Sequence, residues 1–274
     1  MRYYPELVFS IALSFFTSNA YASAWTQEQG NTLLIVTSSY YTANEMYDNN
    51  GHSQPQAPYH QYELNPYLEY GYRDDITLGS NLFLESATQN ASSGNSSEIN
   101  WGLGDSEFFL RKRLWQQDGF VVSAEPLVKL PSPQASASDQ PKLGDSHTDM
   151  AMGFSGGYGF SAYGLNHFID VDTQYRYRFG PQKDQVRVNA SAGIGLTEHW
   201  ALMPQAFLTY RINEPAVPRY TESTSDDYNL VRLQLSAVYA LTPATSFQLG
   251  GFDDTGGKNV GEGKGVIFAI WKKI

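Results

Sequence analysis

Cysteine is absent from the 274 residues of this chain, and long apolar runs are scarce. Without cysteine, disulfide bonds and thiolate metal sites are excluded. The one long apolar run, residues 7–16, is too short to cross a bilayer as a helix, which needs about 20 residues. The sequence therefore excludes a helical membrane protein. Basic residues are also few, 18 against 28 acidic ones, and the net charge of -10 argues against nucleic-acid binding.

The N-terminus has the features of an export signal. Its apolar run is followed by small residues, and Ala22 and Ala24 each complete an Ala-x-Ala sequence. This arrangement is typical of a secretory signal peptide. We predict a signal peptide over residues 1–22, with cleavage as late as Ala24 as the alternative, and one mature domain over residues 25–274. An N-terminal core helix is the competing interpretation.

Aromatic residues, in contrast, are abundant: the chain has 19 tyrosines and 15 phenylalanines. Such an excess is typical of the aromatic girdles that outer-membrane β-barrels place at both membrane interfaces. The mean hydropathy of -0.40 would suit a soluble protein equally well. A membrane barrel also looks polar, however, because only alternate residues of each strand face lipid.

Short and long connections alternate along the chain. Tight turns are predicted near residues 73–75, 116–119, 161–164, 197–199 and 242–245. Long polar segments lie between these turns. An outer-membrane barrel produces this alternation, with turns at its periplasmic rim and loops at the cell surface. The loops near 42–58 and 131–148 are long enough to fold into the barrel mouth.

The predicted fold is an all-β, antiparallel, up-and-down transmembrane barrel of the outer-membrane type, with about 12 strands and both chain ends in the periplasm. A closed barrel is required because an open sheet edge in lipid would leave backbone groups unsatisfied. The strands are predicted near residues 31–41, 59–72, 76–87, 102–115, 120–130, 149–160, 165–178, 185–196, 199–211, 228–240, 246–252 and 264–273.

Side-chain alternation assigns a face to each residue of these strands. In the seventh predicted strand, Ile169 and Tyr175 share an apolar face, whereas Asp170 and Arg176 share a charged face. A soluble barrel would turn the apolar face inward. A membrane barrel turns it toward lipid and keeps a polar lumen.

Two segments depart from this pattern. Lys112 falls on the apolar face, where it would have to snorkel to the periplasmic rim. Residues 33–36 are apolar on both faces, so they are either partly shielded or assigned in the wrong register.

The charged faces predict which ionisable side chains line the lumen. The acidic residues are Glu63, Glu69, Glu85, Asp105, Glu107, Glu125, Asp170 and Asp172. The basic residues are Arg111, Arg113, Lys129, Arg176, Arg178, Arg187, Arg211 and Arg232. Acids on early strands would face bases on later strands across the lumen. Two hypotheses follow: a transverse field that orients dipolar or zwitterionic solutes, or ion pairs that fill and rigidify the lumen.

Several short motifs resemble one known family. They are Gly-Leu-Gly-Asp at 102–105, Arg-Lys-Arg-Leu at 111–114, Val-Lys-Leu-Pro at 128–131, Leu-Gly-Asp at 143–145 and a glycine-rich segment at 255–265. Their order resembles the bacterial outer-membrane family named for the MetA pathway of phenol degradation and described as transporters. The family continues Leu-Pro with Thr-Gly, whereas this chain has Ser132 and Pro133. The resemblance implies a barrel that passes small, aromatic or hydrophobic solutes, and it implies no catalytic residue.

Three functions are compatible with the sequence. The first is a narrow channel for passive uptake of small solutes, and the second is a closed barrel whose surface loops bind a partner or support the membrane. The third is an outer-membrane hydrolase, for which residues 145–149 supply aspartate, serine and histidine. Residues adjacent in sequence rarely provide the geometry of a catalytic triad, so we predict that the chain is not an enzyme.

The expected partners follow from the barrel itself. They are outer-membrane lipid, a small solute and the outer-membrane assembly machinery, which would read the Gly-x-x-aromatic-x-apolar pattern of residues 265–270 in the C-terminal strand. The five histidines are dispersed, without metal-ligand spacing, so no metal or cofactor site is predicted.

Overall fold

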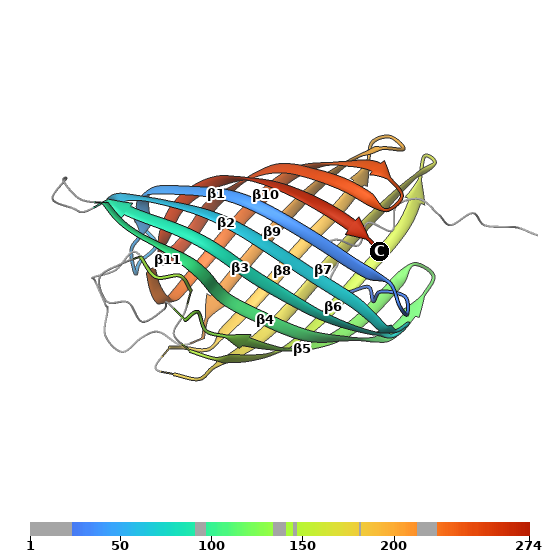
Figure 1. Ribbon diagram of the computed structural model, residues 1–274, viewed down its shortest axis with the longest axis horizontal. Coiled ribbons are helices and arrows are strands. Elements are labelled where there is room, and N and C mark those ends of the chain that lie inside the picture. The colour runs from blue at the N-terminus through green and yellow to red at the C-terminus, as the bar shows by residue number, and fades with distance from the viewer. Residues whose placement is uncertain (1–23, 91–96, 134–140, 145–146, 181, 213–223) are drawn as a thin grey trace, which may run out of the picture.

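The computed structural model describes residues 24–90, 97–133, 141–144, 147–180, 182–212 and 224–274, which form a closed antiparallel β-barrel (Figure 1). Each strand pairs with its neighbours in chain order, and the last strand closes the barrel against the first. The strands are β1 (Thr32–Tyr47), β2 (Ser53–Arg73), β3 (Ile76–Asn90), β4 (Ser97–Gln117), β5 (Phe120–Leu130), β6 (Asp149–Ala162), β7 (Leu165–Arg178), β8 (Gln185–Gly195), β9 (Trp200–Arg211), β10 (Thr224–Thr242) and β11 (Thr245–Lys273). Among the described residues, none forms a helix long and apolar enough to cross a membrane.

β11 is a continuous run of strand residues that folds back on itself as a hairpin, so each of its two halves crosses the barrel wall once. Residues 245–260 pair antiparallel with β10, and residues 260–273 pair antiparallel with β1. Because β1 and β10 run in opposite directions, β11 must reverse between its two halves. Asn259, whose φ is 54°, stands at this reversal. Ten strands that cross once and β11, which crosses twice, give the 12 crossings that the sequence predicted.

The two rims of the barrel differ, as the predicted alternation of connections requires. Tight turns join β2 to β3, β4 to β5, β6 to β7, β8 to β9 and β10 to β11 at one rim, where β1 also begins and β11 ends. We call this end the turn rim and the opposite end the loop rim. Gly119 and Gly164 lie in these turns at φ values of 85° and 75°, which a residue without Cβ adopts at no steric cost.

The connection between β1 and β2 is shorter than the sequence predicted. Strand pairing continues to Tyr47 and resumes at Ser53, so the predicted loop over 42–58 was wrong in its bounds. The prolines of this segment favour a loop because they cannot donate to a strand ladder. Here a register shift between Ala43 and Glu45 accommodates them and lets the ladder continue.

Asp48 closes the short connection that remains. Its Oδ1 accepts the backbone N–H of Asn50 at 2.7 Å and that of His52 at 2.9 Å. These hydrogen bonds, that from His52 foremost, hold the pKa of Asp48 below its ordinary value. The turn is therefore fixed by one carboxylate.

The outer surface of the barrel is apolar and the lumen is polar. On β7, Ile169, Val171 and Tyr175 are exposed on the outside, whereas Asp170 and Arg176 are buried inside. This is the sense of alternation that the sequence predicted for a membrane barrel. Large aromatic side chains are exposed near the turn rim (Trp115, Phe120, Tyr163, Trp200) and toward the loop rim (Tyr62, Trp101, Tyr177, Tyr210).

Lys112 lies beside the turn rim, as its predicted snorkelling requires. Its ammonium group forms an ion pair with Asp75 in the turn between β2 and β3. The hydrogen bond from Lys112 holds the pKa of Asp75 below its ordinary value. The charge on the apolar face is thus compensated at the membrane boundary.

An apolar cluster occupies the lumen side of the wall near the turn rim. Leu33 and Ile35 of β1 are buried against Met203, Val238 and Trp271. The run that is apolar on both faces is therefore shielded on its inner side by neighbouring strands. Its register is also the expected one, because alternate residues of this run point inward.

Candidate functional site

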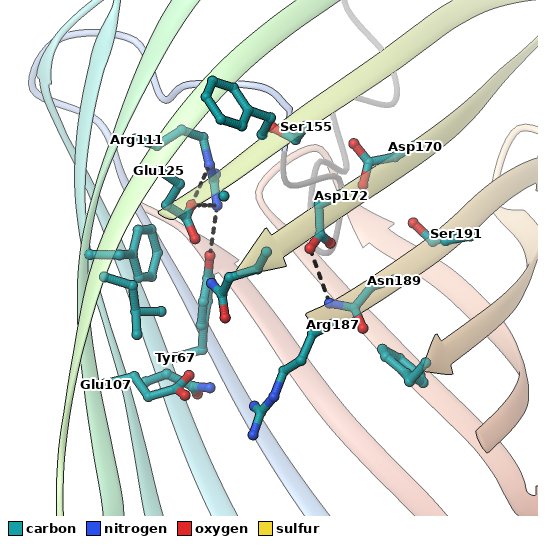
Figure 2. Close-up of a pocket in the computed structure, with 18 of the residues that line it drawn as sticks. Tyr67, Glu107, Arg111, Glu125, Ser155, Asp170, Asp172, Arg187, Asn189 and Ser191 are labelled. Atoms are coloured by element: carbon teal, nitrogen blue, oxygen red, sulfur yellow. Dashed lines mark hydrogen bonds and ion pairs between the residues drawn. The ribbon is translucent and has the colours of Figure 1, made fainter. Parts of the chain in front are cut away.

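The lumen contains a cavity of about 230 Å³ (Figure 2). Its wall is built from inward-facing residues of β2 to β9, and it combines aromatic rings such as Phe109 and Phe207 with ionisable side chains. Typical ligand pockets measure roughly 300–1,000 Å³. The cavity can therefore accept only a small solute.

Arg111 is the centre of the first charged cluster in this wall. Its side chain is 4% exposed, and its Nη1 donates to Glu69 at 2.6 Å while its Nε donates to Glu125 at 2.9 Å. The Tyr67 hydroxyl donates to the same Glu69 carboxylate at 2.5 Å. One guanidinium thus compensates two carboxylates and ties β2, β4 and β5 together on the lumen side.

A second group of ion pairs joins strands across the lumen. Arg176 on β7 donates to Glu107 on β4 at 2.7 Å. Two strands lie between these partners in the wall, so this contact spans the interior. Lys129 on β5 lies 3.1 Å from both Asp105 and Asp149. Acids and bases that the sequence placed on opposite sides of the lumen meet directly here.

Arginines toward the loop rim hold neighbouring connections. Arg178 lies 3.8 Å from Asp149 and 3.7 Å from Asp227. Arg211 donates to the Asn49 side chain at 2.8 Å and to the Asp227 carbonyl at 3.2 Å. These side chains therefore fasten the β1–β2 connection to the start of β10.

The remaining wall of the lumen carries one ion pair and one pair of like charges. Arg232 on β10 donates to Asp254 at 2.7 Å and lies 4.2 Å from the centroid of the Phe252 ring. Glu63 and Glu85 are cross-strand partners on β2 and β3. Within the described residues, neither glutamate forms an ion pair. Most of the charged side chains that suggested a transverse field across the lumen are thus paired with other protein groups.

The last four predicted lumen charges have different surroundings. Asp172 accepts a hydrogen bond from Asn189 at 3.2 Å, and Asp170 accepts the backbone N–H of Ala24 at 3.1 Å. Arg113 is half-buried two positions after Arg111, close to the turn rim. Arg187 lines the cavity and points away from the Arg111 cluster, toward the side where Glu107 lies (Figure 2).

A short segment of chain before β1 lies inside the barrel, which the sequence did not predict. We call residues 24–29 the plug segment; residues 24–27 are buried or half-buried, whereas Glu28 and Gln29 are exposed at the turn rim. Ala24 is fully buried, with its N–H on Asp170 and its carbonyl accepting the Ser123 hydroxyl at 2.5 Å. Gln27 donates its side-chain amide to Glu69 at 2.5 Å. The segment therefore occupies part of the lumen at the turn-rim end.

Trp25 provides the largest side chain of the plug segment. Its ring lies edge-on to Phe168, with 6.2 Å between centroids. A Cβ atom at Gly157 would collide with the same ring. The Gly156–Gly157 pair on β6 was the available sequence signal, because glycine in a strand indicates close approach of another group.

The connection between β5 and β6 covers part of the loop rim. Leu143 is fully buried against Tyr59 and Ala87, which face the lumen from β2 and β3. The Asn100 side chain donates to the Pro141 carbonyl at 3.0 Å. The described part of the predicted 131–148 loop therefore folds onto the inner wall, as its length allowed.

Of the residues considered for a hydrolase, the two described ionisable ones have other partners. His147 bonds to the Gln182 side chain at 2.7 Å, and Asp149 is engaged by Lys129 and Arg176. The other two candidates, residues 145 and 146, lie outside the described residues. The described part of the chain also contains no group of three histidine or acidic side chains suited to a metal.

Comparison with solved structures identifies the architecture. The COG4313 outer membrane channel from Pseudomonas putida F1 superposes with a TM-score of 0.72 at 14% identity, over 92% of this chain and 98% of that chain. The NanC porin superposes with a TM-score of 0.53 at 12% identity, over 88% and 100% of the two chains. The fold is that of an outer-membrane β-barrel. At such low identity the likeness extends to the fold alone.

Sequence comparisons add no family to this result. No family model and no curated protein matches the chain. The resemblance to the phenol-degradation family therefore stays a prediction, although the barrel architecture that it implied is present.

Proposed function

We propose that this chain is an outer-membrane channel for the passive entry of small solutes. The observation that carries the proposal is the barrel's polarity: apolar side chains cover the outside, while charged side chains surround a cavity inside. Charges in a lumen need water or a partner, and a water-filled lumen connects the two sides of a membrane. The small cavity restricts passage to small molecules.

The proposed orientation places the turn rim in the periplasm. Outer-membrane barrels have short periplasmic turns and longer outer loops, and the turn rim is where β1 begins and β11 ends. The C-terminal half of β11, with its apolar and aromatic outward residues, is the proposed contact for the assembly machinery. Aromatic or hydrophobic solutes, which the family resemblance implied, are the first to test.

A closed barrel with a structural role is the second candidate. It is favoured by the plug segment and by the ion pairs that cross the lumen. Electrical measurement separates the two candidates, because only an open path carries ions.

The proposal predicts single-channel steps of low conductance. Residues 23–274 would be refolded, checked for folding by heat-modifiable gel mobility and inserted into a planar bilayer. We expect discrete steps and a measurable reversal potential in a salt gradient. If protein that is demonstrably folded gives no conductance steps, the channel proposal is overturned and the closed barrel is favoured.

The export signal carries a separate prediction. We expect the mature chain from the outer membrane to begin at Ser23, after cleavage at Ala22. Cleavage after Ala24 would remove a residue whose N–H and carbonyl are both bonded within the lumen. Intact-mass measurement of the membrane-extracted protein decides this, and a chain beginning at Trp25 would contradict it.

A further inference from the structure

We propose that Arg187 binds the carboxylate of a small organic anion whose apolar body lies against the aromatic side of the cavity. This inference rests on the proposed channel function, because it names the class of solute that the lumen selects. It concerns one side chain whose bonding differs from that of the other cavity-lining arginines.

Arg187 has no ion-pair partner in the described part of the barrel. Its protein contacts are to the Gln185 side-chain oxygen, from Nε at 3.3 Å and from Nη2 at 3.1 Å. A guanidinium has five N–H donors, so three remain directed elsewhere. Figure 2 shows the side chain extending away from Arg111 and Glu125, toward the side of the view where Glu107 is labelled. Because Arg187 lines the cavity, the donors that Gln185 does not use are within reach of a solute there.

The other arginines of the cavity are occupied. Arg111 is shared by Glu69 and Glu125, and Arg176 is bonded to Glu107. Their charges are thus compensated by the protein itself. Within the described chain, Arg187 is hydrogen-bonded only to the neutral amide of Gln185, although Glu107, Asp149 and Arg176 are close enough to interact with its charge.

None of the acidic side chains of the cavity is hydrogen-bonded to Arg187 in the described part of the chain, although Glu107 attracts it electrostatically. Each has a protein donor of its own: Arg111 for Glu69 and Glu125, Arg176 for Glu107, the Ala24 amide for Asp170 and the Asn189 amide for Asp172. Each of these carboxylates thus already has a donor from the protein, whereas Arg187 has N–H donors that no carboxylate accepts. A solute that brings acceptor oxygens complements the cavity better than one that brings donors.

The geometry of the group indicates a carboxylate. A guanidinium presents parallel N–H groups that match the two oxygens of a carboxylate, and such charge-assisted bonds are the strong ones. The cavity wall also includes Phe109 and Leu127 on β4 and β5, and Phe207 on β9, the strand next to that of Arg187. A compact ring or short hydrocarbon attached to the carboxylate would contact these residues, and the volume of about 230 Å³ excludes larger bodies.

Binding can be measured without relying on conduction. The probe is 4-fluorobenzoate, observed by fluorine NMR line broadening in the presence of the folded barrel in lipid nanodiscs. The uncharged 4-fluorobenzamide is the matched probe for apolar contact alone. Both the intact barrel and one lacking the plug segment would be used, so that a blocked entrance cannot conceal the site.

Arg187→Gln is the decisive variant, because removing this arginine strands no carboxylate and the fold should persist. Arg113→Gln is the matched control, since it removes a lumen-side arginine near the turn rim. We expect 4-fluorobenzoate to bind about tenfold more weakly to R187Q, because its charge-assisted hydrogen bonds are lost, and R113Q to bind like the wild type.

The outcomes separate this inference from the channel proposal. Equal binding by wild type and R187Q, equal binding of the two probes, or no binding to either form of the barrel would overturn the assignment to Arg187. Ionic conductance with no benzoate binding would leave the channel proposal standing while the inference fails. Benzoate binding that depends on Arg187, without conductance, would support the inference and contradict the channel.

Discussion

Replacing the plug segment with a glycine-serine sequence of equal length should raise the single-channel conductance several-fold. Residues 24–27 of this segment lie in the turn-rim half of the lumen, where Ala24 and Trp25 are held by Ser123, Asp170 and Phe168. Ion flow is limited by the narrowest and least polar part of a pore. Loss of the anchoring contacts lets this segment leave the lumen, and the measurement is conductance in a planar bilayer.

The point variant Trp25→Ala refines this experiment. It removes the bulk of the indole while keeping the backbone hydrogen bonds of Ala24, so an intermediate conductance is expected. Trp115→Ala is a suitable control, because this tryptophan is exposed on the outer wall. If the glycine-serine variant conducts like the wild type, the plug segment does not obstruct the ion path.

Substituting Arg111 with methionine should lower the free energy of unfolding by about 3–5 kcal/mol, which is typical when one partner of a buried charge pair is removed. The change leaves Glu69 and Glu125 close together without their common guanidinium. It also removes the hydrogen bond to the Trp25 carbonyl at 3.0 Å. Urea unfolding in lipid vesicles, followed by gel mobility, measures the loss.

Two further variants test this explanation. Adding Glu69→Gln and Glu125→Gln to the methionine variant should recover much of the stability, because the two carboxylates that Arg111 compensated are then neutral. Arg187→Gln should have little effect, since Arg187 has no acidic partner among the described residues. A methionine variant as stable as the wild type would mean that the lumen hydrates both carboxylates well.

The period of the strands was predictable because the environment on each side of the wall is uniform. Exposed Ile169 and Tyr175, against buried Asp170 and Arg176, follow the alternation in the sequence. Even the doubly apolar start of β1 was assigned to a strand, although its inward packing on Trp271 requires the far end of the chain. The local sequence pattern was therefore sufficient to predict a strand wherever each of its faces meets a single environment, either lipid or the polar lumen.

The arrangement inside the lumen was less predictable for a physical reason. Which acid meets which base depends on the tilt and curvature of the barrel, so the contact between Glu107 and Arg176 cannot be obtained from alternation. The plug segment has no repeating pattern, and its buried partner Asp170 lies 146 positions away from Ala24. The prolines of β2 also made the sequence predict a loop where the structure has a strand.

The double crossing of β11 has a consequence for how the barrel forms. Its second half pairs Lys273 with Leu33, and these residues are 240 positions apart. Joining such distant segments costs about 5 kcal/mol of chain entropy, and until they join, β1 and β11 are both open edges exposed to lipid. The wall therefore gains its full ladder only when the very end of the chain is in place. Truncation within the final residues should leave an unsealed sheet rather than a slightly weaker barrel.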